Sequence, residues 1–94
     1  MPHFVLTCFD KPGALDLRMA TRPAHLEYID GSLDFLRLAG PLLDDAGQTI
    51  GSLIILECER DRAEAFAAND PYQIAGLFER SELREMKVTR GELR

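Results

Sequence analysis

The chain has 94 residues, of which 46% are hydrophobic and 29% charged, and its 11 basic and 16 acidic side chains give a net charge of −5. This length and composition are typical of one small globular domain and exclude a disordered chain. The acidic balance, without a basic cluster interleaved with aromatics, argues against nucleic acid as a partner. No apolar run approaches the roughly 20 residues that span a bilayer, and the N-terminus lacks the pattern of a signal peptide. We therefore expect a cytoplasmic protein with no membrane partner.

The two cysteines and two histidines of the chain do not form a recognisable metal motif. Cys8 and Cys58 lie in apolar, strand-like segments. A disulfide between them is possible from the sequence, but two buried thiols are expected in a reducing compartment. There is no CxxC pair, Walker loop, GxGxxG or HExxH motif. We expect no metal and no cofactor.

The first elements in chain order are predicted to be a strand, a helix and a second strand. Residues 3–10, "HFVLTCFD", are rich in β-branched and aromatic residues and end at a Pro-Gly turn. A helix is predicted from about Leu15 and should end near Gly31. Residues 34–41 form the second predicted strand, closed by Gly-Pro. The helix carries apolar residues at spacings of four and seven, which predict its buried face: Leu15, Met19, Leu26 and Leu33.

A hairpin, a strong strand and a second helix are predicted next. Residues 42–49 contain the turn residues of a hairpin loop, and residues 50–59 are the most apolar strand segment. Residues 61–70 are predicted to be helical. Asp61 and Glu64 have the spacing of an N-cap and capping-box pair at the start of this helix.

The remaining segments complete a β-α-β-β-α-β order. Residues 70–78 are predicted to be a break followed by a short helical turn. Residues 80–88 should form the last strand, although their pattern is also compatible with a helix. This order is that of the ferredoxin-like α+β fold, a four-stranded antiparallel sheet with helices on one face.

The two predicted central strands are apolar on both faces. In the third strand Leu53 and Ile55 point one way, and Ile54 and Leu56 the other. Helices cover one face of such a sheet, so the second apolar face needs another cover. The simplest cover is a second copy of the sheet, which predicts a homodimer.

His25 borders the predicted apolar stripe of the first helix, three residues after Arg22. On its own, such a histidine is explained by one hydrogen bond to a nearby carbonyl, and the arginine by a side chain that extends to solvent. Asp70 precedes Pro71 and has a similarly simple explanation as the N-cap of a helix with proline at its first position. Tyr72 could serve only for packing.

Four segments together resemble the YCII-related family. These are Arg-Pro-x-His at 22–25, Ala-Gly-Pro at 39–41, Gly-Ser at 51–52 and Asp-Pro-Tyr-x-x-Ala-Gly at 70–76. They occur in the family's order and approximate spacing, and the resemblance extends from the first strand to about residue 83. On this basis residues 1–94 are identified as a single YCII-related domain.

The resemblance implies a ferredoxin-like fold of the dimeric α/β-barrel type with a cleft that holds a His–Asp pair. The pair is carried onto His25 and Asp70, the expected catalytic residues, which should lie within hydrogen-bond reach. Five other matching positions are the expected substrate-binding residues: Arg22, Gly40, Pro41, Ser52 and Tyr72. The family includes an enzyme that eliminates HCl from a chlorinated hydroxyquinol, whereas most members have no assigned reaction.

A His–Asp pair is suited to acid–base chemistry. The carboxylate fixes the tautomer of the imidazole and stabilises its protonated form, and the other ring nitrogen takes a proton from a phenol or carbon acid. Such a site could abstract protons, isomerise or eliminate on a small polar aromatic or enol. A non-catalytic dimer that binds a small molecule, and a purely structural role for the pair, are the alternatives. The sequence does not name a substrate.

Overall fold

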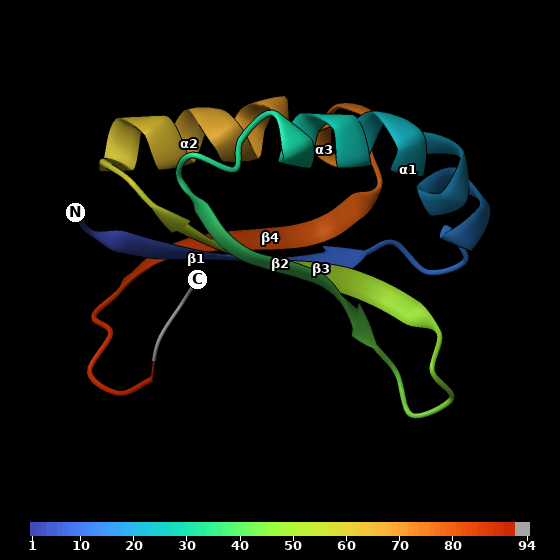
Figure 1. The fold of residues 1–94 in the computed structure, drawn as a ribbon. Helices are drawn as coiled ribbons and strands as arrows, with labels where there is room; N and C mark the ends of the chain where they lie inside the picture. The colour runs from blue at the N-terminus through green and yellow to red at the C-terminus, as the bar shows by residue number, and fades with distance from the viewer. Residues whose placement is uncertain (92–94) are drawn as a thin grey trace.

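Two layers make up the computed structural model, which describes residues 1–91: a sheet and, on one of its faces, the helices (Figure 1). The elements in chain order are β1 (His3–Asp10), α1 (Leu15–Asp30), β2 (Leu36–Leu43), β3 (Thr49–Glu57), α2 (Arg60–Asn69), α3 (Pro71–Ile74) and β4 (Phe78–Met86). The described part of the chain contains no helix that is both long and apolar enough to cross a membrane.

The four strands are antiparallel neighbours in the order β2-β3-β1-β4. This is the ferredoxin-like α+β fold of the dimeric α/β-barrel type, as predicted, with the two most apolar strands at the centre. The last segment is a strand and not a helix, because its residues pair with β1 along almost its whole length. It begins two residues earlier than predicted, and β2 two residues later.

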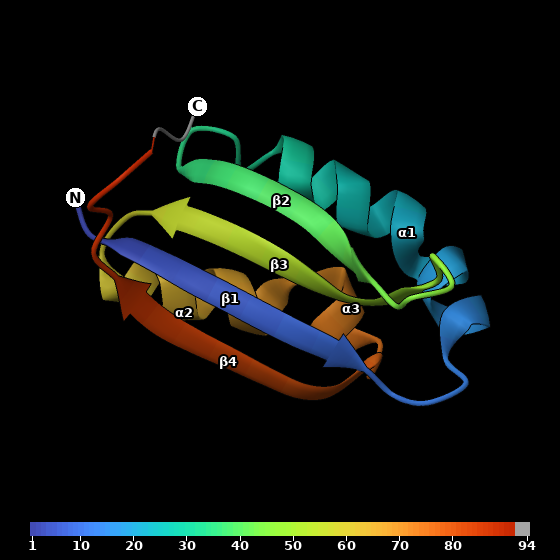
Figure 2. The ribbon, with the colours of Figure 1, turned by 90° about the horizontal axis from the view of Figure 1, so that it is seen from below.

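The pairing of β1 with β3 separates the side chains into two faces. Phe4 lies opposite Leu56 and Leu6 opposite Ile54, and these four are buried under the helices. The intervening residues of both strands point to the other face, which no helix covers (Figure 2). The alternation predicted from the sequence is therefore present, and it places the hydrophobic core between the sheet and the helices.

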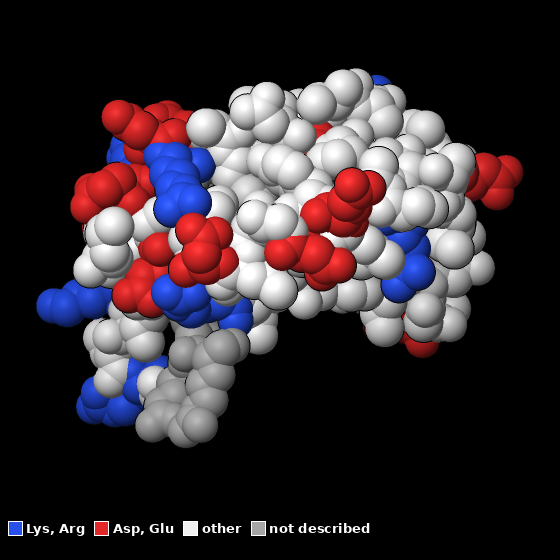
Figure 3. Space-filling view, turned by 45° about the horizontal axis from the view of Figure 1, so that its top comes forward, with Lys and Arg blue, Asp and Glu red and all other residues white. Residues whose placement is uncertain are grey.

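The predicted buried face of α1 is wrong. Leu15, Met19, Leu26 and Leu33 are 43%, 56%, 41% and 57% exposed. The buried residues of the helix are Arg18, His25 and Ile29. Arg18 and His25 each bond to a carboxylate on another element. These contacts set which side of the helix faces the sheet. Figure 3, which views the molecule from the side of the helices, shows a large area of surface without charged side chains.

The ends of the helices agree in part with the sequence. Helix α1 stops at Asp30 and is followed by Gly31, as predicted, and it continues through Pro23. The predicted cap of α2 is wrong, because the N-cap is Glu59 and no side chain caps the helix. Asp61 lies inside the first turn, where its charge favours the positive end of the helix dipole. Cys8 and Cys58 are both buried as free thiols.

Candidate functional site

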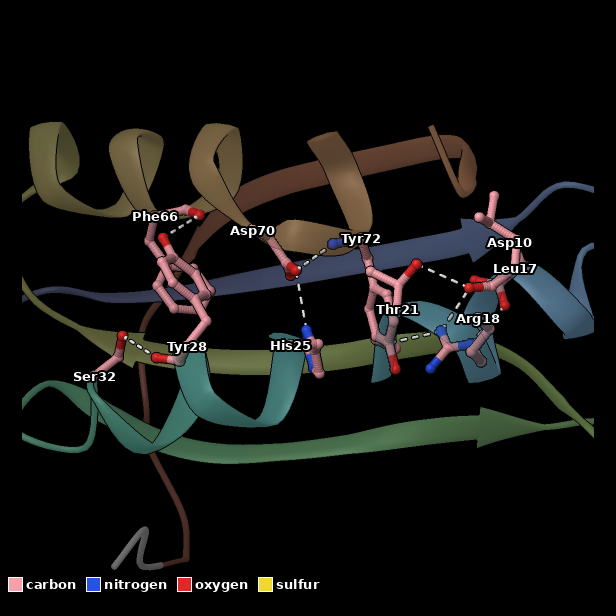
Figure 4. Close-up of polar contacts among 11 residues, drawn as sticks. Asp10, Leu17, Arg18, Thr21, His25, Tyr28, Ser32, Phe66, Asp70 and Tyr72 are labelled. Carbon is pink, nitrogen blue, oxygen red and sulfur yellow. Dashed lines mark hydrogen bonds and ion pairs between the residues drawn. The ribbon is translucent and has the colours of Figure 1, made fainter. Parts of the chain in front are cut away.

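His25 and Asp70 are in direct contact although 45 residues separate them in the sequence. His25 Nδ1 lies 2.9 Å from Asp70 Oδ1, where α1 meets the junction of α2 and α3 (Figure 4). His25 is 9% exposed and Asp70 is 1% exposed. Because a carboxylate can only accept, this contact places the proton on Nδ1 and leaves Nε2 as the free acceptor of a neutral ring.

Asp70 also has the capping role that its position before proline predicts. Pro71 is the first residue of α3, and Asp70 Oδ1 accepts a hydrogen bond of 2.9 Å from the backbone N–H of Tyr72. One oxygen therefore serves both the helix and the histidine. The other oxygen, Oδ2, is buried without a hydrogen-bond partner among the described residues. The carboxylate is thus removed from water and held by two donors.

Tyr72 fixes the plane of the histidine ring. The two rings are stacked, with centroids 4.0 Å apart and an angle of 17° between their planes. The guanidinium carbon of Arg18 lies 4.6 Å from the centroid of the Tyr72 ring. Burial raises the pKa of the Tyr72 phenol, and the opposing effect of the positive charges of Arg18 and Arg22 does not cancel that shift. The phenol is therefore protonated at neutral pH and can donate a hydrogen bond.

Arg18 and Asp10 form a buried ion pair at the other end of this cluster. Arg18 Nε and Nη2 donate to the two oxygens of Asp10 at 2.7 and 3.0 Å, and Nη2 also donates to Ser52 Oγ at 2.9 Å. Burial disfavours the charged guanidinium, but the hydrogen bond and the negative charge of Asp10 outweigh it and raise the pKa of Arg18. Ser52 follows Gly51, where a Cβ would collide with the carbonyl oxygen of Cys8, so glycine allows β3 to approach β1 here.

Neither Arg18 nor Asp10 was predicted from the sequence as a site residue. A signal was present, because Arg18, Arg22, His25 and Ile29 follow one another at spacings of four, three and four, which place them on one face of a helix. The neighbouring stripe of Leu15, Met19 and Leu26 concealed it, because that stripe is the more apolar of the two. Asp10 is the last residue of the first predicted strand, and nothing in its local sequence points to a buried partner.

A pocket of about 270 Å³ lies between α1 and the end of the sheet formed by β2 and β3. Six of the seven predicted site residues line it: Arg22, His25, Gly40, Pro41, Ser52 and Tyr72. Asp70 does not line the pocket and lies behind His25, to which it is bonded. The structure brings all seven residues to one place, and their roles in catalysis and binding stay predictions. Within residues 1–91, no three His, Cys, Asp or Glu side chains are grouped so that they could hold a metal ion.

The profile of the YCII-related domain matches residues 2–87. The chain belongs to the YCII-related family. It is 36% identical over 93 residues to the protein YciI of Escherichia coli O6:H1, an alignment that covers 89% of this chain and 95% of that protein. A protein YciI from Shigella flexneri has the same identity and coverage.

Two solved structures of enzymes share this fold over nearly the whole chain. The 5-chloro-2-hydroxyhydroquinone dehydrochlorinase TftG of Burkholderia phenoliruptrix, in complex with 2,5-dihydroxybenzoquinone, superposes with a TM-score of 0.83 at 31% identity. The match covers 90% of this chain and 93% of TftG. An antibiotic biosynthesis monooxygenase has a TM-score of 0.63 at 12% identity, covering 96% and 100% of the two chains, and shows the fold alone.

Proposed function

We propose that this YCII-related protein is a cofactor-independent enzyme that uses His25 as a general base on a small polar aromatic or enol. The observation that carries the proposal is the 2.9 Å contact between His25 Nδ1 and Asp70 Oδ1 in the wall of a pocket. Among residues 1–91 the His25 side chain makes this hydrogen bond and no other, so Nε2 is available to a ligand.

The chemistry follows from this arrangement. Nε2 accepts a proton from a phenolic or enolic hydroxyl, and the adjacent buried carboxylate stabilises the imidazolium that forms. The same proton can return to a ring carbon, which isomerises the substrate, or assist departure of a leaving group, which is an elimination. The stacked Tyr72 ring holds the imidazole in one orientation during both steps.

The likeness to TftG supports this reaction class. TftG is named as a dehydrochlorinase of a hydroxylated aromatic ring, and its structure contains a dihydroxybenzoquinone. Both molecules are single six-membered rings with acidic oxygens, which are the groups that a neutral imidazole nitrogen deprotonates.

The test is turnover of a panel of hydroxylated and halogenated aromatics by the wild type and by His25→Asn. We expect the variant to lose about 100-fold or more in kcat/KM while remaining folded, because the asparagine amide can still donate to Asp70. His3→Asn is the matched control, because His3 lies on the uncovered face of the sheet and does not line the pocket. If panel members bind and none is converted, the protein is instead a non-catalytic binder of small molecules.

We also propose that the protein is a homodimer in which two copies cover each other's open sheet face. On that face, β1, β2 and β3 present a largely apolar surface: Val5, Thr7, Phe9, Leu38, Leu42, Leu53 and Ile55. The edge strand β4 adds Arg80, Glu82 and Arg84 to the same face, opposite residues of β1. An apolar centre bordered by charges is the composition of a protein interface, and a domain this small gains stability from association.

A further inference from the structure

The charges around the pocket are distributed unevenly. Its ionisable lining residues are Arg18, Arg22, His25 and Tyr72, and no aspartate or glutamate lines it, although the chain has 16 acidic residues. The two carboxylates of the site, Asp10 and Asp70, are bonded to Arg18 and His25 and do not line the pocket. A ligand therefore meets positive groups and hydrogen-bond donors.

Arg18 has unused donors in a fixed position. A guanidinium has five N–H groups, and those on Nε and Nη2 are used by Asp10 and Ser52. Nη1 is not a donor in these bonds, and the Tyr72 phenol is the further polar group beside the guanidinium among residues 1–91. The bidentate contact with Asp10 holds the guanidinium rigidly, so its free edge is preorganised for an anionic oxygen.

Arg22 supplies a second positive charge, one helical turn after Arg18. Its side chain is exposed and lines the pocket, and within the described residues no carboxylate lies at ion-pair distance from it. The positive charge of Arg22 acts on the Tyr72 phenol, as does that of Arg18. The two guanidinium groups thus act on the same part of the site.

The rest of the pocket is apolar and small. Met19, Leu26, Ile29 and Ile54 contribute hydrocarbon to its wall. A cavity of about 150 Å³ holds one benzene ring, so the volume of about 270 Å³ fits a single substituted ring. Apolar walls with positive groups match a flat hydrocarbon body that carries an anionic oxygen.

We propose that the pocket takes a one-ring organic anion, with its anionic oxygen against Arg18 and Arg22 and its remaining acidic hydroxyl toward His25. This inference rests on the proposed function, because it uses the same pocket and base. Arg18 and Arg22 are then the oxyanion-binding residues. Asp10 and Ser52 are positioning residues that act through Arg18.

The reaction step assigns separate tasks to the basic residues. The substrate O–H bond breaks, its proton bonds to His25 Nε2, and its electron pair stays on the oxygen. The products are an imidazolium and a ring with additional negative charge. Arg18, held by Asp10 and Ser52, stabilises this charge without reorganisation, and Arg22 adds a second positive charge at the pocket.

The experiment compares affinities for matched anionic and neutral probes by calorimetry. One pair is 2,5-dihydroxybenzoquinone, which ionises on the ring, with its neutral 2,5-dimethoxy analogue. The other is 4-hydroxybenzoate with 4-hydroxybenzamide, where the charge is on a carboxylate. The pair with the larger anion preference identifies which kind of oxyanion the site accepts. In the wild type we expect the anion of at least one pair to bind about 10-fold or more tightly than its neutral partner.

Amino-acid substitutions distinguish the effect of positive charge at the pocket from the effect of the protein's net charge. Arg22→Gln should lower the anion preference about 5-fold or more, whereas Arg84→Gln, an equal change of net charge on the open face of the sheet, should not. Arg18→Met alone leaves Asp10 buried without a partner and is expected to unfold readily. The double variant Asp10→Asn/Arg18→Met removes both charges, keeps the net charge at its wild-type value and should still lose the preference. Ser52→Ala should lower the preference to a smaller extent with neutral-probe affinity unchanged.

Equal binding of anionic and neutral probes by the wild type, or a preference that survives both the Arg22 and the double variant, would overturn this inference. His25→Asn distinguishes it from the proposed function, since this variant should keep the anion preference while losing turnover. A preference that depends on Arg18 and Arg22 without any turnover supports the anion site and rejects the enzyme. Turnover that depends on His25 without such a preference supports the enzyme and rejects the anion site.

Discussion

At the scale of single residues, Asp70 Oδ1 has two tasks that can be separated by substitution. It caps α3 through the N–H of Tyr72 and accepts from Nδ1 of His25. An asparagine oxygen can accept the same two hydrogen bonds but carries no charge to stabilise an imidazolium. The charge of Asp70 can therefore be removed while both bonds remain possible.

We expect Asp70→Asn to retain stability and to lose about 100-fold or more in turnover. Asp70→Ala should in addition lose about 1 kcal/mol of stability with the helix cap. It should also release Nδ1, so that the ring populates both tautomers. Urea denaturation measures the stability, and ¹⁵N NMR of the His25 ring under alkaline conditions measures the tautomer. Wild-type turnover in Asp70→Asn would show that Asp70 is only a cap.

Cys8 pairs with Ser52 of the site across the sheet. Its buried thiol makes the stability of the fold depend on pH in the alkaline range. Burial, followed by the negative charges of Asp70 and Asp10, raises the pKa of the Cys8 thiol from 9.0 to about 12. The folded state therefore favours the protonated thiol. The associated stability is complete below pH 9 and is lost as the pH rises from 9 toward 12.

The comparison of wild type with Cys8→Ala isolates this effect from other groups that titrate in the same range. Between about pH 8 and about pH 10.5, the wild type should lose about 1–2 kcal/mol more of its unfolding free energy than the variant. Urea denaturation at the two pH values provides the measurement. Equal losses would mean that the thiol titrates normally in the folded protein.

At the scale of elements, α1 packs with its less apolar side toward the sheet. Ile29 is buried in the core cluster, whereas Met19 is 56% exposed. We expect Ile29→Ala to cost about 2–4 kcal/mol of unfolding free energy. Met19→Gln should change it by no more than about 0.5 kcal/mol. Chemical denaturation of both variants measures these changes in unfolding free energy. A larger loss for Met19→Gln than for Ile29→Ala would show that the helix is turned the other way or that its outer face is covered in solution.

At the scale of the whole molecule, the open sheet face decides the state of association. Light scattering should give twice the mass of one chain. Leu53→Glu places a charge at the centre of that face, opposite Thr7, and should shift the protein to monomers. Ile74→Glu, the same kind of change at a residue of α3 that is 71% exposed, should remain dimeric. A monomeric wild type at micromolar concentration would reject the proposed dimer.

The sequence by itself determined the strands, their faces and the order of the elements. The alternation of Phe4 and Leu6 with Val5 requires only that successive side chains point to opposite faces. Asp70-Pro71 specified a helix start in the same local way, since proline restricts the residue before it. The residues that line the pocket came from the family's motifs, because no local rule brings residues 25, 40, 52 and 72 together.

Only the tertiary structure decided which side of α1 is buried and which charges form the site. Hydrophobic periodicity favoured the side with Leu15 and Leu26, but Arg18 and His25 are buried instead. Their partners Ser52 and Asp70 lie 34 and 45 residues away along the chain. A buried charge is stable only when its partners are in place, and those partners are assembled by the packing of α1 against β3 and α3, not by any pattern within the helix.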